Sequence, residues 1–424
     1  MTFLRTTLSN GLEILILEQH TAPVASCWIW YRVGSRNEED SLTGISHWTE
    51  HMMFKGTERW PHGQADKAIS RVGGTYNGMT WLDFTSFYAS LPVQHLPLIL
   101  DIEADRMHNC RISEEDVAAE RPVILSERAG QENSPLFLLS EALTAAAYQV
   151  HPYGHEIVGR LEDIHTMTAT DIQQHHATYY TPRNALITAA GAVNAAETAQ
   201  LIASYFDAVY SAPEPPRITI VEPAQEAQRR VTLHGSGQTS YLEVAYHIPE
   251  GTHDDNYALT VLNAVLTGGS GFLVGRGSLT NHTSRLYLGL VDQEMTLDIT
   301  GTMMPTIDPG LYRLTATLWP GKSRDIVEST LWEQVERLQH SIITPAELNK
   351  AQQQSRALFA YASESITYQA FWLGFSAQFT DYSWYQQYLD RIAAVTAEDV
   401  LRAAQKYLRA ENRTVGWYIG DAAA

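Results

Sequence analysis

The sequence predicts an α+β protein built from two homologous α/β halves, each a mixed sheet covered by helices. Residues 161–172 align with residues 389–400 at a constant offset of 228 positions (389 minus 161), and the alignment continues without a gap to Asn184 and Asn412. A chain of 424 residues is also too long for one ordinary domain. The matched order over this length indicates a duplication.

Each copy of the repeat predicts the same elements. A threonine-capped helix is followed by a turn and then a strand, over residues 185–190 in the first half and 414–419 in the second. A proline-rich, polar segment begins at Ser211 and has the composition of an extended linker. We therefore expect an N-terminal domain over residues 1–210, a linker over 211–228 and a C-terminal domain over 229–424.

The remaining elements follow from apolar runs. Residues 12–17 and 25–31 predict two strands of the first half, and residues 241–249 predict the corresponding strand of the second half. The helix expected next, residues 256–266, carries no His or Glu in ligand spacing. Metal chemistry is therefore expected in the first half only.

One segment of the first half carries the residue types of a zinc hydrolase. His47, Glu50 and His51 occur in the order H-x-x-E-H, and residues three and four apart share one face of a helix. Neutral imidazoles suit zinc, and a nearby carboxylate can take the proton of an attacking water, which makes Glu50 the expected base. The alternative is a buried helix whose histidines only satisfy hydrogen bonds, because Trp48 and residues 52–54 are apolar.

A third ligand is expected on a second helix. Ser113 caps this helix, acidic residues fill its first turn, and Pro122 predicts a kink or a later start. Glu120 and Glu127 are seven positions apart on one face. Their apolar neighbours predict burial, and buried carboxylates need a partner such as a metal.

The chain resembles the pitrilysin and insulysin metallopeptidases, and among them the mitochondrial-processing-peptidase subfamily. That family carries H-x-x-E-H and a glutamate seventy-six positions after the second histidine, which is Glu127 here. The flanking sequences also match, over residues 44–46, 52–57 and 120–127. Further matches follow in the family's order at residues 8–12, 33–36, 73–78 and 151–154.

This resemblance implies one zinc per chain, bound by His47, His51 and Glu127. Glu50 would be the base, and Glu120 would support the site from nearby. The fold would form half of a peptidase chamber, and the activity would be hydrolysis of peptides by a zinc-activated water.

The resemblance also implies where substrate binds. In the family the strand that matches residues 74–80 is an exposed sheet edge near the zinc, and we expect a peptide to add to it as an extra strand. The residues expected to bind it are Thr75, Tyr76, Asn77 and Gly78, with Asn77 near the scissile bond. Family members usually have alanine where Gly78 stands.

One departure from the family bears on activity. Active members present an Arg and a Tyr, four residues apart, downstream of a Ser-Arg-Leu segment in the second half. Residues 284–286 supply that segment, but gapless continuation puts Glu294 and Asp298 at the two positions. Acidic groups there would repel a developing oxyanion. Either a partner supplies the pair, or the chain is weakly active. In the processing-peptidase subfamily two homologous subunits divide these tasks, so the resemblance implies a heterodimer in which a homologous partner supplies the Arg/Tyr pair.

Two other functions stay open. A non-catalytic scaffold or peptide-binding subunit would keep the fold without turnover, and it would predict a broken zinc motif. A structural zinc would need a fourth ligand. His151, His155, His175 and His176 are candidates only by composition, and the last two are expected on an exposed helix face.

Charge and composition exclude some classes of function. The formal net charge of −19 argues against nucleic-acid binding. Solubility accounts for this charge, and an acidic chamber that prefers cationic peptides is the alternative. No apolar run is long enough for a membrane span, and no signal peptide precedes the first strand, so we expect a cytoplasmic protein if Met1 is the true start.

Overall fold

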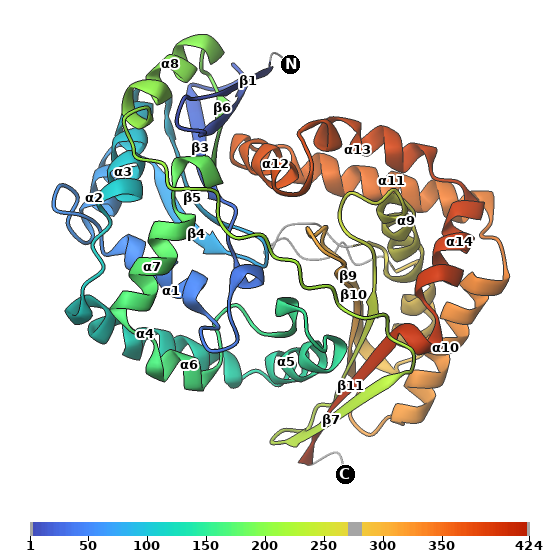
Figure 1. The fold of residues 1–424 in the computed structure, drawn as a ribbon. Coiled ribbons are helices and arrows are strands. Elements are labelled where there is room, and N and C mark those ends of the chain that lie inside the picture. The colour runs from blue at the N-terminus through green and yellow to red at the C-terminus, as the bar shows by residue number, and fades with distance from the viewer. Residues whose placement is uncertain (1–2, 270–281, 422–424) are drawn as a thin grey trace. The chain divides into compact units, whose positions relative to one another are not determined.

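The computed structural model describes residues 3–269 and 282–421, which form two compact units (Figure 1). The first unit contains Met1–Gly130, His155–Ile220 and Ser363–Tyr382. The second contains Gln131–Gly154, Val221–Ala362 and Ser383–Ala424. The chain passes between the units after Ile220, within the segment expected as a linker, but each half of the sequence also gives one segment to the other unit. The sequence did not predict this exchange.

A six-stranded mixed sheet forms the centre of the first unit, in the order β1-β2-β6-β3-β5-β4. Its strands are β1 (Phe3–Thr7), β2 (Glu13–Glu18), β3 (Val24–Tyr31), β4 (Thr75–Thr80), β5 (Thr85–Pro92) and β6 (Ala185–Gly191). β2 and β6 run parallel, and the other neighbours are antiparallel. Within the described residues, β4 has a partner strand on one side only.

Helices cover both faces of this sheet. They are α1 (Ile45–Phe54), α2 (Gln64–Arg71), α3 (Leu96–Asn109), α4 (Glu114–Glu132), α6 (Leu161–Thr166), α7 (Ala169–Tyr179), α8 (Ala195–Phe206) and α12 (Ile366–Phe379). Alternate residues of β3, including Cys27 and Ile29, enter the core beneath α3 and α8. Trp30, from the other face, packs on α12, where a Cβ at Gly374 would lie 2.1 Å from the indole ring. Glycine is therefore required for this close contact.

The second unit repeats this plan, although its described residues include no counterpart of β1. Its sheet has the order β7-β11-β8-β10-β9, with β7 and β11 parallel and the other pairs antiparallel. The strands are β7 (Arg229–Gly235), β8 (Tyr241–His247), β9 (Thr296–Thr302), β10 (Leu311–Leu318) and β11 (Arg413–Gly420). Helix α5 (Pro135–Ala147) packs on β7, β8 and β11, and α9 (Asp255–Thr267) contacts β9. The other helices are α10 (Arg324–His340), α11 (Pro345–Ala362), α13 (Ser383–Ala394) and α14 (Ala397–Tyr407).

The predicted repeat is present in detail. Thr168 caps α7 and Thr396 caps α14, each through a reciprocal capping box. Each helix then leads into the central strand β6 or β11. Asn184 and Asn412 each donate a hydrogen bond from the side-chain amide to a carbonyl at the end of the preceding helix, at 2.9 and 2.7 Å. The predicted fold class, two α/β halves with mixed sheets covered by helices, is confirmed.

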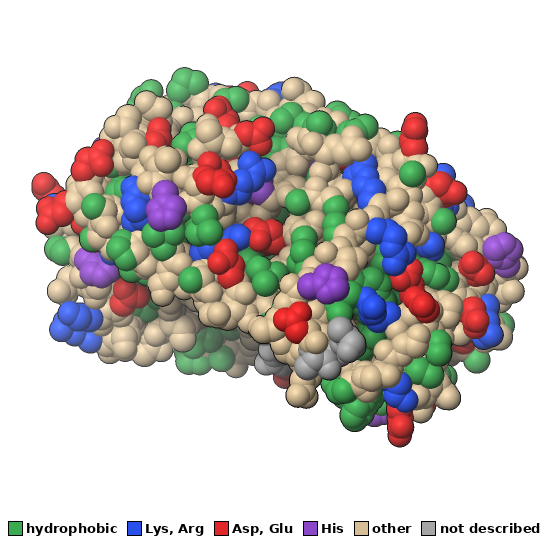
Figure 2. All heavy atoms as spheres, turned by 90° about the horizontal axis from the view of Figure 1, so that it is seen from below, with side chains coloured by type: hydrophobic (Ala, Val, Ile, Leu, Met, Phe, Trp, Pro, Cys, Tyr) green, Lys and Arg blue, Asp and Glu red, His purple; other side chains and the backbone are tan. Residues whose placement is uncertain are grey.

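Two further features bear on the expectations about membrane association and charge. No helix among the described residues is long and apolar enough to span a bilayer. On the face shown in Figure 2, acidic and basic side chains of the described residues are interspersed. The negative charge is therefore not gathered into one patch on this face.

Candidate metal centre

The start of helix α1 is fixed by a buried carboxylate. Glu38 accepts hydrogen bonds from the backbone N–H groups of Gly44 at 2.7 Å and Ser46 at 2.9 Å. Such N–H groups have no partner within their own helix. Gly44 has a φ of 88°, and a Cβ there would lie 2.5 Å from the carbonyl oxygen of Val158. This geometry sets the register of the helix that carries His47, Glu50 and His51.

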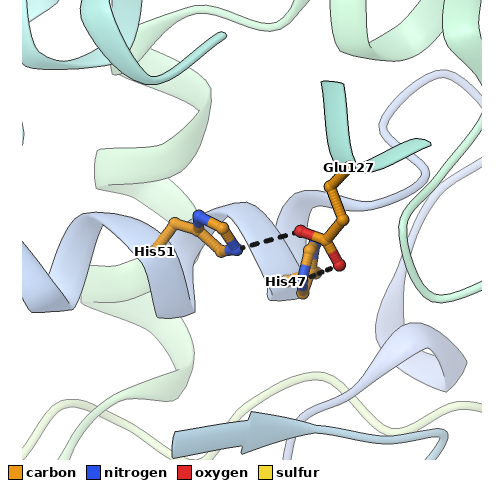
Figure 3. Close-up of side chains that lie close together, drawn as sticks. All are labelled: His47, His51 and Glu127. Carbon is orange, nitrogen blue, oxygen red and sulfur yellow. Dashed lines mark ion pairs between the residues drawn. The ribbon is translucent and has the colours of Figure 1, made fainter. Parts of the chain in front are cut away.

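Three of the predicted site residues come together in space (Figure 3). His47 and His51 project from α1 toward Glu127 of α4. His47 Nε2 lies 3.7 Å from Glu127 Oε1, and His51 Nε2 lies 3.6 Å from Glu127 Oε2. A tetrahedral zinc with bonds of about 2.0–2.2 Å holds its ligand atoms about 3.4 Å apart. The separations in this cluster therefore fit a zinc ion, and it is the metal-competent group found among the described residues.

The chemistry of the donor set also fits zinc. Burial, together with the neighbouring His51, lowers the pKa of His47 to about 4, so this imidazole is neutral at pH 7. Burial lowers the pKa of His51 too, but hydrogen bonds with Glu127 and Glu120 outweigh it and raise that pKa. A metal needs the neutral imidazole. Binding of zinc at His51 is therefore expected to displace a proton.

A second layer of side chains orients His51. Its Nδ1 donates to Glu120 Oε1 at 2.9 Å, which leaves Nε2 facing Glu127. The other oxygen of Glu120 pairs with Lys55. Burial raises the pKa of Glu120, but the hydrogen bonds from Lys55 and His51 outweigh burial and lower this pKa below its usual value. The carboxylate is therefore ionised. A carboxylate behind a ligand histidine fixes its tautomer and raises its basicity. His47 lacks such support, because its Nδ1 is buried without a hydrogen-bond partner in the described part of the chain.

Glu50 lies beside the cluster without joining it. Its side chain is buried, and burial raises its pKa. Thr80 of β4 opposes this rise by donating a hydrogen bond from Oγ1 to Glu50 Oε2 at 2.6 Å. A carboxylate with a raised pKa next to a group of metal-binding side chains is suited to accept and return a proton near neutral pH.

The four predicted substrate-binding residues do not all face the cluster. Tyr76 and Gly78 lie on the face of β4 that contacts α1, and the rings of Tyr76 and Phe54 are 5.5 Å apart. Thr75 and Asn77 alternate with them and are exposed. Asn77 Oδ1 accepts a hydrogen bond from the N–H of Gly78 at 2.9 Å.

Several expectations about individual side chains were wrong. Glu120 is buried as predicted, but the Glu127 side chain is 38 % exposed, because α4 turns this part of its surface to solvent. Pro122 does not delay the start of α4, since the helix runs over Glu114–Glu132 with Pro122 inside it. His175 is buried, with Nε2 3.2 Å from Ser46 Oγ, and His176 is half-buried. Neither histidine is on an exposed face.

Sequence reasoning missed Thr80, Lys55 and Glu38. The first two had a detectable signal. Thr80 follows Gly78 at strand spacing and so shares its face, and Lys55 follows His51 at helix spacing. Glu38 lies in a loop before α1, where no periodicity predicts a contact.

In the second unit, the two positions where the sequence comparison placed the family's Arg/Tyr pair lie at the start of the edge strand. Glu294 precedes β9 with a φ of 53°. Asp298 lies within β9 and accepts a hydrogen bond from the N–H of Thr317 at 3.0 Å. Residues 284–286 lead into a π-helix, Tyr287–Val291. The glycine-rich stretch that begins at Gly268 lies mostly outside the described residues.

Comparison with known families accounts for both units. The family described as insulinase (peptidase family M16) matches residues 13–160, and the peptidase M16 inactive domain matches residues 166–355. The chain is a member of the M16 peptidase family. The first M16 match contains the whole histidine and glutamate cluster. The second begins before α7 and ends in α11, and it carries the description of an inactive domain.

Individual relatives of this M16 chain are named as zinc proteases. Zinc protease PqqE of Helicobacter pylori is 29 % identical over 419 residues, which cover 95 % of this chain and 89 % of that protein. A probable mitochondrial-processing peptidase subunit beta of Arabidopsis thaliana is 31 % identical over 263 residues, 62 % of this chain and 50 % of that protein. The crystal structure of a protease from Helicobacter pylori matches with a TM-score of 0.92 at 26 % identity, over 98 % of this chain and 99 % of that one. These comparisons support a zinc protease of the M16 family.

Proposed function

We propose that this M16 protein is the zinc-bearing catalytic subunit of an endopeptidase that hydrolyses peptides inside a chamber. The observation that carries the proposal is the convergence of His47, His51 and Glu127. The carboxylate of Glu50 lies beside these three side chains and is not one of the candidate ligands. Three protein ligands leave a fourth position for water or substrate, which is the pattern of a catalytic zinc rather than a structural one.

The chain's own residues then have distinct tasks. A zinc ion bound here would supply an activated water and would polarise the scissile carbonyl. Glu50 would accept the proton of the attacking water and return it to the leaving amine. Glu120, held by Lys55, would keep the Nδ1 proton of His51 in place and so keep Nε2 directed at the ligand cluster.

The open edge of β4 supports docking of an extended peptide. Trp81 donates from its N–H to the carbonyl of Phe84 at 2.8 Å, and this pair continues the register in which Thr80 faces Thr85. Hydrogen-bonded pairs alternate with non-hydrogen-bonded pairs along an antiparallel ladder. The N–H and C=O groups of Tyr76 and Gly78 therefore point away from β5, toward the open edge. The N–H of Gly78 donates there to Asn77 Oδ1 at 2.9 Å, and a docking peptide would replace this acceptor. A peptide that adds here would gain main-chain hydrogen bonds that do not depend on its sequence.

A homologous partner is part of the proposal. Glu294 and Asp298 occupy the positions where active members of the family present an Arg/Tyr pair, and neither can donate to an oxyanion when ionised. We infer that a second M16 subunit supplies the pair. The alternative is a non-catalytic scaffold or peptide-binding subunit. The inactive-domain match favours it for the second unit, but the intact cluster of the first unit counts against it.

Metal stoichiometry combined with cleavage tests the proposal. The wild-type chain should bind about one zinc, and a chelator should remove both the zinc and any peptide cleavage, with recovery on re-addition of zinc. His47→Ala, His51→Ala and Glu127→Gln should each weaken zinc binding, whereas Glu50→Gln should keep it. A chain that binds no zinc, or that cleaves peptide equally well without it, contradicts the proposal.

A further inference from the structure

Strand β4 controls the position of both carboxylate oxygens of Glu50. Thr80 Oγ1 donates to Oε2 at 2.6 Å. Two residues earlier, a Cβ on Gly78 would lie 3.0 Å from Oε1, and 2.9 Å from the rings of Phe54 and Phe87. The carboxylate therefore lies directly over the strand, in space that opens because residue 78 has no side chain.

The same strand offers its backbone to a peptide. Tyr76, Gly78 and Thr80 are alternate residues, so their side chains share the face toward α1 while their N–H and C=O groups point away from β5. Docking at the edge and contact with Glu50 thus use different atoms of one short segment. The backbone meets the substrate, and the Thr80 hydroxyl and the bare Cα of Gly78 meet the base.

We propose that Thr80 is a positioning residue that orients Glu50 and couples this base to the strand on which the peptide docks. The inference rests on the proposed function, and it adds that substrate docking and base alignment are mechanically linked through β4. A peptide that orders this edge would also order Thr80, and through it the oxygen that must reach the attacking water.

Glu50 is a buried carboxylate that receives a side-chain hydrogen bond from Thr80. Glu50 is 8 % exposed, and the Thr80 hydroxyl is the donor that the structure gives to its Oε2. Hydrogen bonds to charged groups are stronger than those between neutral groups. Without this donor the carboxylate can rotate about its last side-chain bond, and a misdirected base slows the chemical step without weakening the main-chain contacts that hold the peptide.

Thr80→Val and Thr80→Ser form the matched pair for the test, because valine keeps the shape and removes the hydroxyl while serine keeps the hydroxyl. With zinc loaded and the partner subunit present, Thr80→Val should lower kcat by about 10–100-fold and leave KM nearly unchanged. Thr80→Ser should recover most of the rate.

A binding measurement and a control variant separate positioning from general damage. A fluorescent peptide should bind metal-free Thr80→Val protein with the wild-type Kd, since docking uses backbone atoms. Thr188→Val removes another buried hydroxyl of the same sheet, one that accepts from Trp30 Nε1 at 3.1 Å and donates to the carbonyl of Ala370 at 2.9 Å. This control should lower the melting temperature but not kcat.

The outcomes distinguish this inference from the proposed function. Wild-type kcat in Thr80→Val, or a Thr80→Ser variant that is no faster than Thr80→Val, overturns the positioning inference while Glu50→Gln still tests the base. A weaker peptide Kd in Thr80→Val that accounts for the whole loss of rate also overturns it. Absence of cleavage by the zinc-loaded wild-type complex overturns both proposals.

Discussion

Helix α1 of the first unit and helix α9 of the second each hold a polar side chain over a glycine of the edge strand. In the first unit this is Glu50 over Gly78, where an added Cβ would lie 3.0 Å from Glu50 Oε1. In the second unit it is Asn263 over Gly301, where the corresponding distance to Asn263 Oδ1 is 2.0 Å. The order β2-β6-β3-β5-β4 of the first sheet also matches the order β7-β11-β8-β10-β9 of the second. The same scaffold therefore presents an acid in one unit and an amide in the other.

The hydrogen bonds around the two side chains explain what the difference means. Asn263 donates from Nδ2 to the carbonyl of Gly301 at 3.0 Å, and its Oδ1 accepts from Tyr312 at 2.9 Å and Thr267 at 2.8 Å. This amide is engaged at both ends and ties α9 to its sheet. Glu50 receives a side-chain hydrogen bond from Thr80 and has a pKa raised by burial. A helix–strand contact that is structural in the second unit is thus suited to proton transfer in the first.

The largest expected effect comes from making the first unit resemble the second. Glu50→Gln replaces the acid with a neutral amide of the same shape. It should lower peptide cleavage by about 10²–10⁴-fold, because an amide cannot accept the proton, and it should leave bound zinc unchanged. Asn263→Asp is the matched change in the second unit, and it should lower thermal stability without lowering kcat. Cleavage at the wild-type rate by Glu50→Gln would remove Glu50 from the mechanism.

The second prediction concerns the Arg/Tyr pair of the family. On the proposal that Glu294 and Asp298 stand in its place, the zinc-loaded chain alone should be a poor peptidase. A homologous partner that carries the pair should raise kcat by at least about a hundredfold, the scale associated with one oxyanion donor. Substituting the partner's Arg and Tyr should abolish this gain while gel filtration still shows the complex. High activity of the isolated chain, unchanged by a partner, would mean that another residue stabilises the oxyanion.

The third prediction tests the edge of β4. N-methylation of one peptide nitrogen removes one donor from the substrate and leaves its side chains intact. Because a docked strand pairs through every second residue, cleavage should be sensitive to N-methylation at alternate positions only, with a loss of about tenfold in kcat/KM at each. Equal tolerance at all positions would argue against strand addition at this edge. Losses at every position would point to a binding mode that encloses the whole backbone.

Local patterns in the sequence predicted much of the fold and the core of the site. The H-x-x-E-H segment predicted that His47 and His51 share one face of α1, and the capping threonines predicted the starts of α7 and α14. These features depend on residues within one or two helical turns of each other. Glu127 was added by its spacing within a known family, and the structure brings it to the two histidines.

The exchange of helices between the units could not be predicted in this way. Helix α12 is apolar around much of its circumference, with Phe371, Trp372 and Leu373 all buried. It lies on the first sheet because Gly374 admits Trp30 and because Thr188 donates to the carbonyl of Ala370. Such partners are fixed by shape across long stretches of sequence, 182 positions for Thr188 and Ala370 and more for Trp30 and Gly374. For Thr80 the strand spacing from Gly78 indicates the shared face, but its contact with Glu50 depends on how β4 approaches α1.

The smallest expected effect is on the pH dependence of stability, and it concerns one carboxyl group near the start of α1 and one near the start of α9. Burial raises the pKa of Glu38 to about 8. Burial acts in the same direction on Asp255, but hydrogen bonds from Tyr407, Arg402 and Lys406 outweigh it and hold the pKa of Asp255 well below its usual value. The two groups should therefore give stability contributions of opposite pH dependence.

The sign follows from linkage. A lowered folded-state pKa means that Asp255 stabilises the protein above the unfolded pKa of about 4, and that this contribution is lost as the pH falls further. The raised pKa of Glu38 gives a contribution that is present below the unfolded pKa and is lost as the pH rises toward 8. Asp255→Asn should cost about 1 kcal/mol at pH 7, since Arg402 and Lys406 are half-exposed and solvent screens them.

Urea unfolding from about pH 3 to about pH 9 checks both signs, because this range covers the unfolded carboxyl pKa values near 4 and the Glu38 pKa of about 8. Asp255→Asn should flatten the acid side of the stability curve, and Glu38→Gln should reduce the loss of stability as the pH rises toward 8. A curve that keeps its acid slope in Asp255→Asn would show that other carboxylates, and not this one at the start of α9, control the acid stability of the second unit.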